Sequence, residues 1–420
     1  MSSKKNIPAI RFAGFDGEWR TKDFSDSFNP LRNNTLSRAD LNYDYGDVLN
    51  VHYGDILVKF GENIDVESST IPYITDSIIA QKLVSNQLQN GDVIFADTAE
   101  DETAGKCSEL MNINNSIVVS GLHTMPYHPI SRYASGYLGY YLNCNRFHNQ
   151  LMPLMQGTKV MSISKTAIQN TYIRYPEKET EQEQISSYFK NIDHLITQST
   201  KRLEKLKNLK KAYLEKMFPR GGATTPELRF KGFSDEWKEE QLGAEHITSS
   251  YSGGTPLVGN QDYYNGDIPF IRSGEINLET TELTITSKGL NNSSAKLVNK
   301  GDILYALYGA TSGEVGISNI AGAINQAVLA IITKKGYNAE FISYWLRREK
   351  ANIIGTYLQG GQGNLSGAII KQLIILFPTY KEQQEIGNFF RNIDEQIAKQ
   401  TEKLDKLKNI KKACLDKMFV

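Results

Sequence analysis

The stretch Lys205-Leu-Lys-Asn-Leu-Lys-Lys-Ala-Tyr-Leu-Glu-Lys-Met-Phe218 decides the fold, because the chain contains it twice. It returns as Lys406-Leu-Lys-Asn-Ile-Lys-Lys-Ala-Cys-Leu-Asp-Lys-Met-Phe419, within an ungapped match of residues 182–218 to 383–419 that has 20 of 37 positions identical. A second repeat opens each half: Pro8-Ala-Ile-Arg-Phe-Ala-Gly-Phe-Asp-Gly-Glu-Trp19 returns as Pro226-Glu-Leu-Arg-Phe-Lys-Gly-Phe-Ser-Asp-Glu-Trp237. A period of about 200 residues is too long for a solenoid and indicates a duplicated domain with a connector.

The connectors carry apolar residues at a period of seven, which predicts long helices with a coiled-coil seam. We expect this seam to consist of Ile185, Phe189, Ile192, Ile196, Leu203, Leu206, Tyr213 and Met217, and of Ile386, Phe390, Ile393, Ile397, Leu404, Leu407, Cys414 and Met418. Thr180-x-x-Glu183 and Thr379-x-x-Glu382 predict a capping box at each helix start. Because only a short linker separates the first helix from the second domain, the second helix must run back to pair with the first. The alternative is that each helix packs on its own domain alone.

The residues between the repeats differ, so the sequence predicts two different domains on one repeated framework. We expect a first domain over residues 1–176, a helix and linker over 177–222, a second domain over 223–377 and a second helix over 378–420. Short apolar runs predict the mixed α/β (α+β) class, with two globular domains joined by two long antiparallel helices as a pseudo-twofold tandem repeat. Gly-Asp followed by two aliphatic residues predicts a tight turn into a buried strand, at Gly46, Gly54, Gly91 and Gly301.

Composition narrows the class of protein. The 420 residues carry 47 Lys plus Arg against 47 Asp plus Glu, and this neutrality excludes a strongly basic, histone-like DNA binder. The three cysteines are widely spaced, which argues against disulfides or a zinc site and suits a reducing cytosol. We expect no signal peptide, because no apolar segment follows the basic residues near the N-terminus. No apolar run approaches the ~20 residues of a membrane span, so we expect a cytoplasmic protein.

Sequence motifs of catalysis are absent from the chain. It contains no Gly-x-x-x-x-Gly-Lys-Ser/Thr, His-Glu-x-x-His or Gly-x-Ser-x-Gly motif, and Asn29-Pro30 is followed by Leu31 rather than by a second proline and an aromatic residue. We therefore expect no catalytic residue, no metal and no cofactor in this chain, and a stand-alone methyltransferase or nuclease is disfavoured.

Polar segments that contain glycine and aromatic residues indicate binding surfaces instead. Arg, Asn, Gln, Ser and Thr side chains read base edges, and glycine allows a backbone to approach phosphate, although a plain polar loop is the better explanation of any single segment taken alone. The candidates in the first domain are His52, Tyr53, Lys59, Thr98, His123, Arg132, Gln156 and Lys159. Those in the second domain are Tyr251, Ser252, Gly253, Gly254, Thr255, Arg272, Tyr308, Thr311, Asn325, Gln326, Gln359 and Gln362.

Taken together, these features resemble the specificity subunit of type I restriction–modification enzymes over essentially the whole chain. The most specific parts are the duplicated Asn-Ile-Asp…Leu-x-Lys-Leu-Lys-Asn-x-Lys-Lys-Ala helix and Ser252-Gly-Gly-Thr-Pro256…Gly266-Asp-Ile-Pro-Phe-Ile-Arg-Ser273. Similar segments are Tyr308-Gly-Ala-Thr311…Gly313 and Ile324-Asn-Gln-Ala327. The resemblance implies that each variable domain binds one half of an asymmetric, bipartite double-stranded DNA target, with the helices setting the spacing.

The resemblance also implies partners. Two methyltransferase subunits would dock on the duplicated helices and bring S-adenosylmethionine for adenine methylation, while restriction/translocase subunits would bring ATP and Mg²⁺. From another class, the alternative is a non-catalytic coiled-coil scaffold with two protein-binding heads. The distribution of charge favours a DNA-binding protein that needs partner subunits for tight binding. Residues 182–218 and 383–419 carry net charges of +4 and +2, whereas residues 1–176 hold 15 bases and 18 acids. We expect tight DNA binding to need the methyltransferase subunits.

Overall fold

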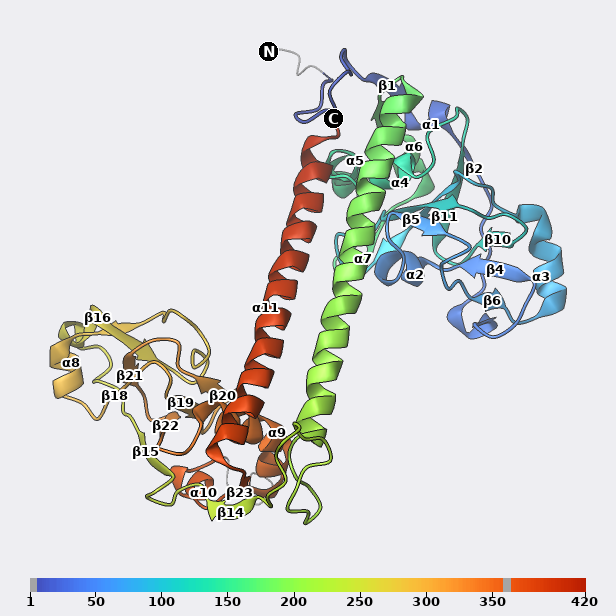
Figure 1. Ribbon diagram of the computed structural model, residues 1–420. Coiled ribbons are helices and arrows are strands. Elements are labelled where there is room, and N and C mark those ends of the chain that lie inside the picture. The colour runs from blue at the N-terminus through green and yellow to red at the C-terminus, as the bar shows by residue number, and fades with distance from the viewer. Residues whose placement is uncertain (1–5, 358–363) are drawn as a thin grey trace. The chain divides into compact units, whose positions relative to one another are not determined.

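The structure, a computed structural model, describes residues 6–357 and 364–420. The chain divides into two compact units, the first comprising Met1–Thr200 with Lys403–Val420 and the second comprising Lys201–Glu402. Each unit therefore contains one domain of strands and helices, the start of one long helix and the end of the other (Figure 1).

The first domain is built on two sheets that differ in their number of strands. A five-stranded sheet has the order β2-β11-β7-β9-β5, and a four-stranded sheet has the order β10-β4-β6-β3. Antiparallel β1 and β13 pair where the chain enters and leaves the domain, and β8 pairs with β12. The strands are β1 (Arg20–Asp23), β2 (Phe28–Pro30), β3 (Leu41–Asn42), β4 (Val48–Val51), β5 (Asn63–Asp65), β6 (Tyr73–Ile74), β7 (Val93–Ala96), β8 (Thr98–Ala99), β9 (Cys107–Met111), β10 (Ile117–Ser120), β11 (Thr124–Pro129), β12 (Met161–Ser162) and β13 (Tyr172–Tyr175). The helices are α1 (Phe24–Ser27), α2 (Tyr53–Val58), α3 (Ser77–Leu83), α4 (Tyr137–Leu142), α5 (Asn145–Leu151), α6 (Lys165–Gln169) and the long α7 (Glu179–Lys216), with 3-10 turns η1 (Arg38–Asp40), η2 (Val84–Asn86) and η3 (Met152–Leu154).

The second domain repeats this plan. Its sheets have the orders β15-β22-β19-β20 and β17-β16-β21-β18, and β14 pairs with β23 where the chain enters and leaves. The strands are β14 (Lys238–Gln241), β15 (Thr248–Ser252), β16 (Tyr264–Ile271), β17 (Thr284–Ile285), β18 (Lys296–Val298), β19 (Ile303–Ala306), β20 (Val315–Ile317), β21 (Gly322–Ile324), β22 (Val328–Thr333) and β23 (Ile374–Phe377). The helices are α8 (Ser287–Asn291), α9 (Ala339–Tyr357), α10 (Gly367–Lys371) and the long α11 (Tyr380–Lys417), with the 3-10 turn η4 (Gln261–Tyr263).

Matching pairings show that the two domains share a common core of strands. Parallel β4 and β10 correspond to parallel β16 and β21, and the antiparallel trio β2-β11-β7 corresponds to β15-β22-β19. The mixed α/β class and the tandem repeat are thereby confirmed. The principal difference follows the large sheet, where the short α4 and α5 of the first domain stand in place of the single 19-residue α9.

The Gly-Asp turns lead into buried strands at three of the four predicted places, namely β4, β7 and β19. The prediction at Gly54 is wrong, because Gly54 and Asp55 lie within α2. His52 begins this helix by accepting a hydrogen bond from the backbone N–H of Gly54, and Asp55 pairs with Arg38 at 2.9 Å. A capped start favours a helical turn over a strand for the same four residues.

The two long helices pair with each other inside both units and run in opposite directions (Figure 1). Each spans 38 residues, and every predicted seam residue is buried or half-buried. In the first unit, Phe189 near the start of α7 shares one apolar cluster with Met418 and Phe419 at the end of α11. The alternative in which each helix packs on its own domain alone is therefore wrong. No helix among the described residues has an apolar stretch long enough to cross a membrane.

The predicted capping boxes do not form. Helix α7 already begins at Glu179, so Thr180 lies inside it. In α11 the spacing is right, since Thr379 precedes the first helical residue, but the carboxylate of Glu382 pairs with Arg229 instead of the backbone at the helix start. A buried ion pair with a distant arginine has replaced the local cap.

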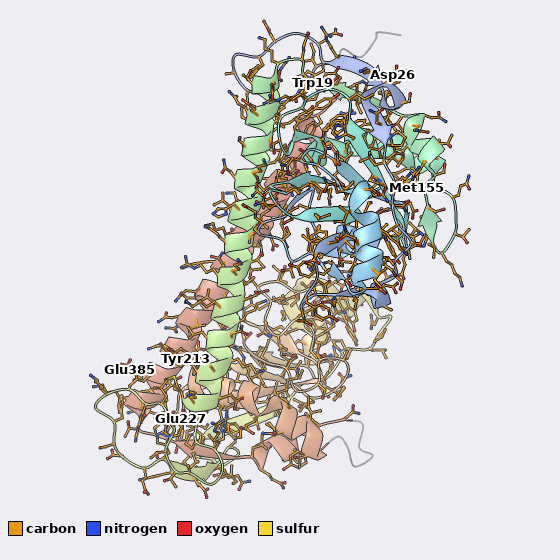
Figure 2. The ribbon with its side chains drawn as sticks, turned by 90° about the vertical axis from the view of Figure 1, so that its right-hand side faces the viewer. Trp19, Asp26, Met155, Tyr213, Glu227 and Glu385 are labelled. Atoms are coloured by element: carbon orange, nitrogen blue, oxygen red, sulfur yellow. The ribbon has the colours of Figure 1, made fainter. Side chains whose placement is uncertain are left out.

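This ion pair explains the Pro-x-x-Arg-Phe repeat. Nε and Nη2 of Arg11 donate to the carboxylate of Glu181, at 2.7 and 2.8 Å, and the side chain of Glu181 is only 2% exposed. The indole of Trp19, labelled at the start of α7 in Figure 2, donates to the same carboxylate at 3.3 Å. In the second unit Arg229 contacts Glu382 at the same two distances.

The Lys-Met-Phe ending of each helix repeat closes the same framework. Phe419 packs against Trp19 and Phe189 in the first unit, with ring centroids 6.2 and 5.8 Å apart. Phe218 packs against Trp237 and Phe390 in the second. The backbone N–H of Ile10 bonds the carbonyl of Lys417 just as that of Leu228 bonds Lys216. Each opening motif thus joins the start of one helix to the end of the other.

A polar pair crosses between the helices at equivalent places. In the first unit Lys411 of α11 contacts Asp193 of α7 at 2.6 Å, and the hydroxyl of Tyr140 donates to the same aspartate at 2.8 Å. In the second unit Lys210 contacts Asp394 and Tyr344 donates to it, also at 2.8 Å. A lysine–aspartate pair with a tyrosine from the domain therefore fixes the register of the helices twice.

Candidate nucleic-acid interface

The first unit gathers most of its predicted site residues at one edge of the sheets. Parallel β4 and β10 are in register, with Val51 opposite Ser120, so both end at this edge. The residues that follow are His52 and Tyr53 after β4 and the turn to His123 after β10. The edge is therefore a product of topology, because parallel strands deliver their following loops to the same side.

His123 occupies the centre of this edge. Its backbone φ of 55° lies in the left-handed region, and its Nδ1 is 3.1 Å from the carboxylate of Asp97. Its ring also lies edge-on to Tyr53, with centroids 5.3 Å apart. Burial raises the pKa of Asp97, and the neighbouring His123 acts in the opposite direction. The exposed imidazole is thus held by two partners and can present its other nitrogen to a ligand.

His52 has a structural role in this arrangement. Its side chain is buried, and its Nδ1 accepts from Gly54 at the start of α2. Burial lowers the pKa of His52, and the nearby Arg38 lowers it further. A neutral, buried ring that caps a helix positions its half-buried neighbour Tyr53.

A third loop reaches the edge through the pairing of β8 with β12. Thr98, which follows Asp97, lies opposite Ser162, and its hydroxyl donates to the carbonyl of Met161 at 3.2 Å. Gln156 pairs with Ser162 through backbone bonds of 2.8 and 2.9 Å, so Gln156 and the exposed Lys159 lie in the loop held against Thr98. At Gly157 an added Cβ would lie 1.9 Å from the carbonyl oxygen of Val160, so the turn requires glycine.

Two predicted cations, Arg132 and Lys59, are held by other groups. Arg132 follows β11 at the opposite end of that strand and contacts Glu179 at the start of α7 at 3.0 Å. Lys59 ends α2, where its ammonium bonds the carbonyl of Thr70 and lies 4.6 Å from the centre of the Tyr43 ring. Arg132 therefore lies away from the edge, and local partners hold both cations.

The second unit builds the equivalent edge from different side chains. Ile271 lies opposite Ile324 in parallel β16 and β21, so Arg272 and Asn325 follow the two strands side by side. The N–H of Gly253 donates to the carbonyl of Asn325 at 3.2 Å, which brings the end of β15, with Tyr251 and Ser252, to the same place.

The amide of Gln326 is held at this edge by Thr255, whose hydroxyl donates to Oε1 at 2.6 Å. Gly253 and Gly254 permit this approach, because a Cβ at Gly253 would lie 1.8 Å from the carbonyl oxygen of Ile324 and one at Gly254 would lie 2.6 Å from Ser294. The exposed Gln326 thus directs its NH₂ group away from Thr255, as a donor for base-edge or phosphate acceptors.

Arg272 is the guanidinium of the second edge. It contacts Glu275 at 3.1 Å and also Glu282, and these two carboxylates raise its pKa. The two carboxylates fix the plane of the guanidinium, and an anionic ligand would have to compete with them for its donors.

Tyr308 and Thr311 of the second domain lie near the end of β19. Leu307 bonds the carbonyl of Ala327 and accepts a bond from Leu365, so Tyr308 and Thr311 lie in a loop beside Gln326. Equivalent bonds join Asp97 to His123 and to Ile163 in the first unit. Gln359 and Gln362 lie outside the described residues.

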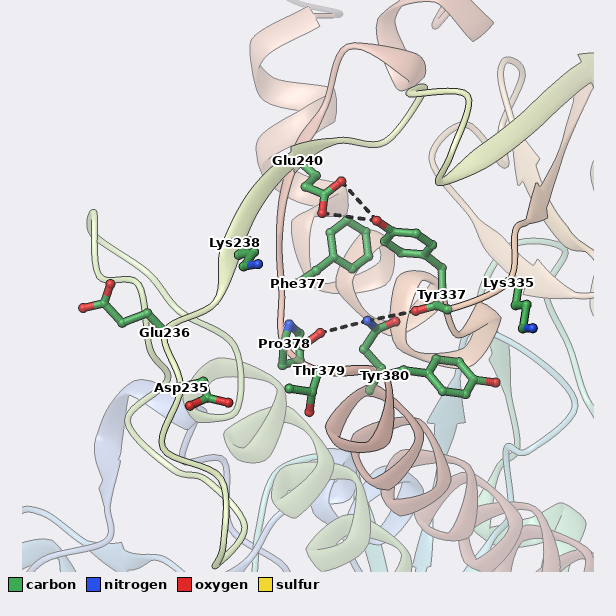
Figure 3. Close-up of a pocket in the computed structure, with 12 residues that line it drawn as sticks. Asp235, Glu236, Lys238, Glu240, Lys335, Tyr337, Phe377, Pro378, Thr379 and Tyr380 are labelled. Carbon is green, nitrogen blue, oxygen red and sulfur yellow. Dashed lines mark hydrogen bonds between the residues drawn. The ribbon is translucent and has the colours of Figure 1, made fainter.

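A hollow of about 590 Å³ at the start of α11 is a separate feature (Figure 3). The hydroxyl of Tyr337 donates to both carboxylate oxygens of Glu240, at 3.2 and 3.1 Å, and the amide of Gln383 donates to the carbonyls of Pro378 and Gly336. Gln383 and Pro378 have counterparts in Gln182 and Pro176 of the first unit, which are joined by the same bond. The lining thus belongs to the repeated framework. Within residues 6–357 and 364–420, no three His, Cys, Asp or Glu side chains converge to hold a metal ion.

Sequence reasoning missed the groups that position the edge. Asp97, which holds His123, and the Glu275–Glu282 pair, which holds Arg272, are the clearest cases. Asp97 follows a buried strand directly before the predicted Thr98, and this position was the available signal. The chain therefore has the architecture of a tandem-repeat protein, in which two different sets of polar side chains lie at equivalent edges of one repeated framework.

Comparison with known proteins identifies the family to which the chain belongs. The family model described as the type I restriction modification DNA specificity domain matches residues 42–208 and 235–409. The chain belongs to this family, as a specificity subunit of a type I restriction–modification system with two tandem DNA specificity domains.

Several known proteins are similar to nearly the whole length of the chain. A protein of Methanocaldococcus jannaschii, provisionally named the type I restriction enzyme MjaX specificity subunit, is 22% identical over 418 residues, covering 96% of this chain and 94% of its own. The S subunit of the type I restriction–modification system of M. genitalium has the same fold, with a TM-score of 0.63, 13% identity and 99% of both chains covered. A further chain has a TM-score of 0.54 and 17% identity over 94% of this chain and 96% of its own; it comes from work on complex assembly and conformational transition of the type I system.

Proposed function

We propose that the two edges bind the two halves of one asymmetric, bipartite double-stranded DNA target. The supporting observation is that one topology places loops at the same edge twice, with His123, Tyr53 and Thr98 in the first unit and Arg272, Asn325 and Gln326 in the second. Different side chains on one framework suit two different half-sites read in the same manner. Methylome sequencing of cells carrying this chain and its methyltransferase should show one bipartite motif, and a continuous or palindromic motif would contradict the proposal.

In this proposal the chain itself is non-catalytic and directs chemistry on partner subunits in the cytoplasm. The methyltransferase subunits supply S-adenosylmethionine and methylate adenine, while restriction subunits supply ATP- and Mg²⁺-dependent translocation and cleavage. The slightly acidic domains favour weak binding by the isolated chain, with affinity gained when methyltransferase subunits contribute phosphate contacts. A tight, salt-insensitive complex of the isolated chain with non-specific DNA would contradict this part.

The exposed face of each long helix is the proposed docking surface for one methyltransferase subunit. Leu209 and Ile410 occupy equivalent positions in the duplicated sequence and are 40% and 38% exposed, with exposed Ala212 and Ala413 one turn further on. A repeated apolar spot on an otherwise charged face suits two copies of one partner.

Substitution of these residues tests the docking surface. Leu209→Glu or Ile410→Glu alone should leave one methyltransferase per chain by native mass spectrometry, and the double variant should leave none. Leu195→Glu is the matched control, because Leu195 is equally exposed on α7 but its counterpart is the polar Gln396. Two bound subunits in the double variant would refute the surface.

A further inference from the structure

The loop between β15 and η4 in the second unit carries two adjacent apolar side chains into solvent. Leu257 is 69% exposed and Val258 is 79% exposed. Their position matters because Thr255, two residues earlier, is hydrogen-bonded to Gln326 at the candidate interface. An exposed apolar pair next to a polar reading group calls for a ligand with both kinds of surface.

The loop is anchored on several sides. Gly253 bonds the carbonyl of Asn325, the hydroxyl of Tyr264 donates to the carbonyl of Pro256 at 2.8 Å, and the N–H of Asn260 donates to the carbonyl of Leu257 at 3.3 Å. These bonds lie before, within and after the apolar pair. Leu257 and Val258 are therefore presented by a fixed backbone, which lowers the entropic cost of binding.

The apolar pair occurs where the two domains differ in length. In the first unit Asn34 bonds the end of β10, and Ser37, three residues later, begins η1. In the second unit Gly253 bonds the residue after β21, and Asn260, seven residues later, begins η4. The extra residues include Leu257 and Val258, so the shorter loop of the first domain has no counterpart of this apolar pair.

The combination of groups matches one base pair. In the major groove a T·A pair presents the thymine methyl group beside the O4 acceptor and the adenine edge, and apolar side chains contact the methyl while amides bond the polar atoms. Gln326 and Asn325 supply amides, and the loop tip supplies apolar surface. The minor groove offers no methyl group, so the major groove is the better match.

We propose that Leu257 and Val258 contact thymine methyl groups in the half-site bound by the second domain. This inference rests on the proposed function, and it assigns T·A specificity to a loop that the first domain lacks.

The test uses the complex of the full chain with its methyltransferase subunits and duplexes carrying the motif mapped by methylome sequencing. Replacing a contacted thymine with deoxyuridine removes one methyl group and should weaken binding about fourfold. The Leu257→Ser/Val258→Ser variant should bind both duplexes equally and should keep the thermal stability of the wild type. Ile374→Ser, an exposed apolar position on β23, is the control and should keep the fourfold difference.

Three results would overturn the inference: a second half-site without thymine, wild-type binding that ignores every deoxyuridine, or a variant that still distinguishes the two duplexes. A wedge between base steps would instead raise the fluorescence of a flanking 2-aminopurine in the wild type alone, with no effect of deoxyuridine. A complex that binds no specific DNA would overturn the proposed function as well, whereas specific binding that ignores deoxyuridine would refute this inference alone.

Discussion

Arg11 and Glu181, 170 residues apart in sequence, form a two-bonded ion pair whose geometry is repeated by Arg229 and Glu382. The pair joins the opening motif of each half to the first turn of the long helix that follows its domain. Because Glu181 and Glu382 are buried, each carboxylate depends on its arginine for charge compensation.

Arg11→Ala should therefore lower the free energy of unfolding by about 3 kcal/mol, because it leaves the buried Glu181 carboxylate without its cationic partner. Urea unfolding of the chain measures this loss. Arg20→Ala is the control: Arg20 pairs with Glu177, but both side chains are more than half exposed, so its loss should be within about 1 kcal/mol. Equal losses in the two variants would contradict a framework role for Arg11.

Glu109 predicts a pH dependence that is confined to the first domain. Its buried carboxylate accepts from the N–H groups of Gly136 and Gly139 at 2.6 and 2.9 Å, and burial raises its pKa from 4.5 to about 7, opposed by those bonds and by Lys190. The folded state then holds a proton that the unfolded state releases. Stability from this group is therefore present below pH 4.5 and is lost as the pH rises to about 7.

The Glu109→Gln variant isolates this contribution. Its free energy of unfolding relative to wild type should rise by roughly 3 kcal/mol between about pH 4.5 and pH 7. Ile317 occupies the equivalent place on β20, opposite Ile303 as Glu109 is opposite Val93, so the second domain should not respond. A difference that is flat, or that falls over this range, would show that the two N–H donors outweigh burial.

The length of the two long helices is expected to set the distance between the two half-sites. Insertion of seven residues into both α7 and α11 keeps the seam in register and adds about 10 Å of helix. The spacer between the half-sites should lengthen by about three base pairs, while both half-site sequences stay the same. Methylome sequencing gives the spacer length and the half-site sequences. A changed half-site sequence would refute the proposal that the helices set only the spacing.

How much the sequence could predict depends on the distance over which each feature acts. The helices and their seam were predictable because the period of seven is local, and the duplicated Phe218 and Phe419 marked equivalent packing. The partner of Glu382 was not, since a capping box is a local expectation and Arg229 reaches that carboxylate from another segment.

The candidate interface shows the same limit. Composition selected His123, Gln326 and Arg272, and the parallel registers of β4 with β10 and of β16 with β21 bring their segments together. Composition also indicates Arg132 and Lys59, because the sequence does not show that a glutamate already pairs with Arg132 or that a carbonyl already bonds Lys59. No sequence pattern marks Leu257 and Val258, since only the structure shows them exposed near Thr255.

The central claim is that each domain reads one half-site independently. Exchange of residues 20–175 for the corresponding domain of a related specificity subunit keeps Trp19, Glu181 and the helices, so the framework should persist. Methylome sequencing of cells carrying this hybrid should show one new half-site, with the other half-site unchanged. A motif altered in both halves, or one identical to the original, would contradict the account.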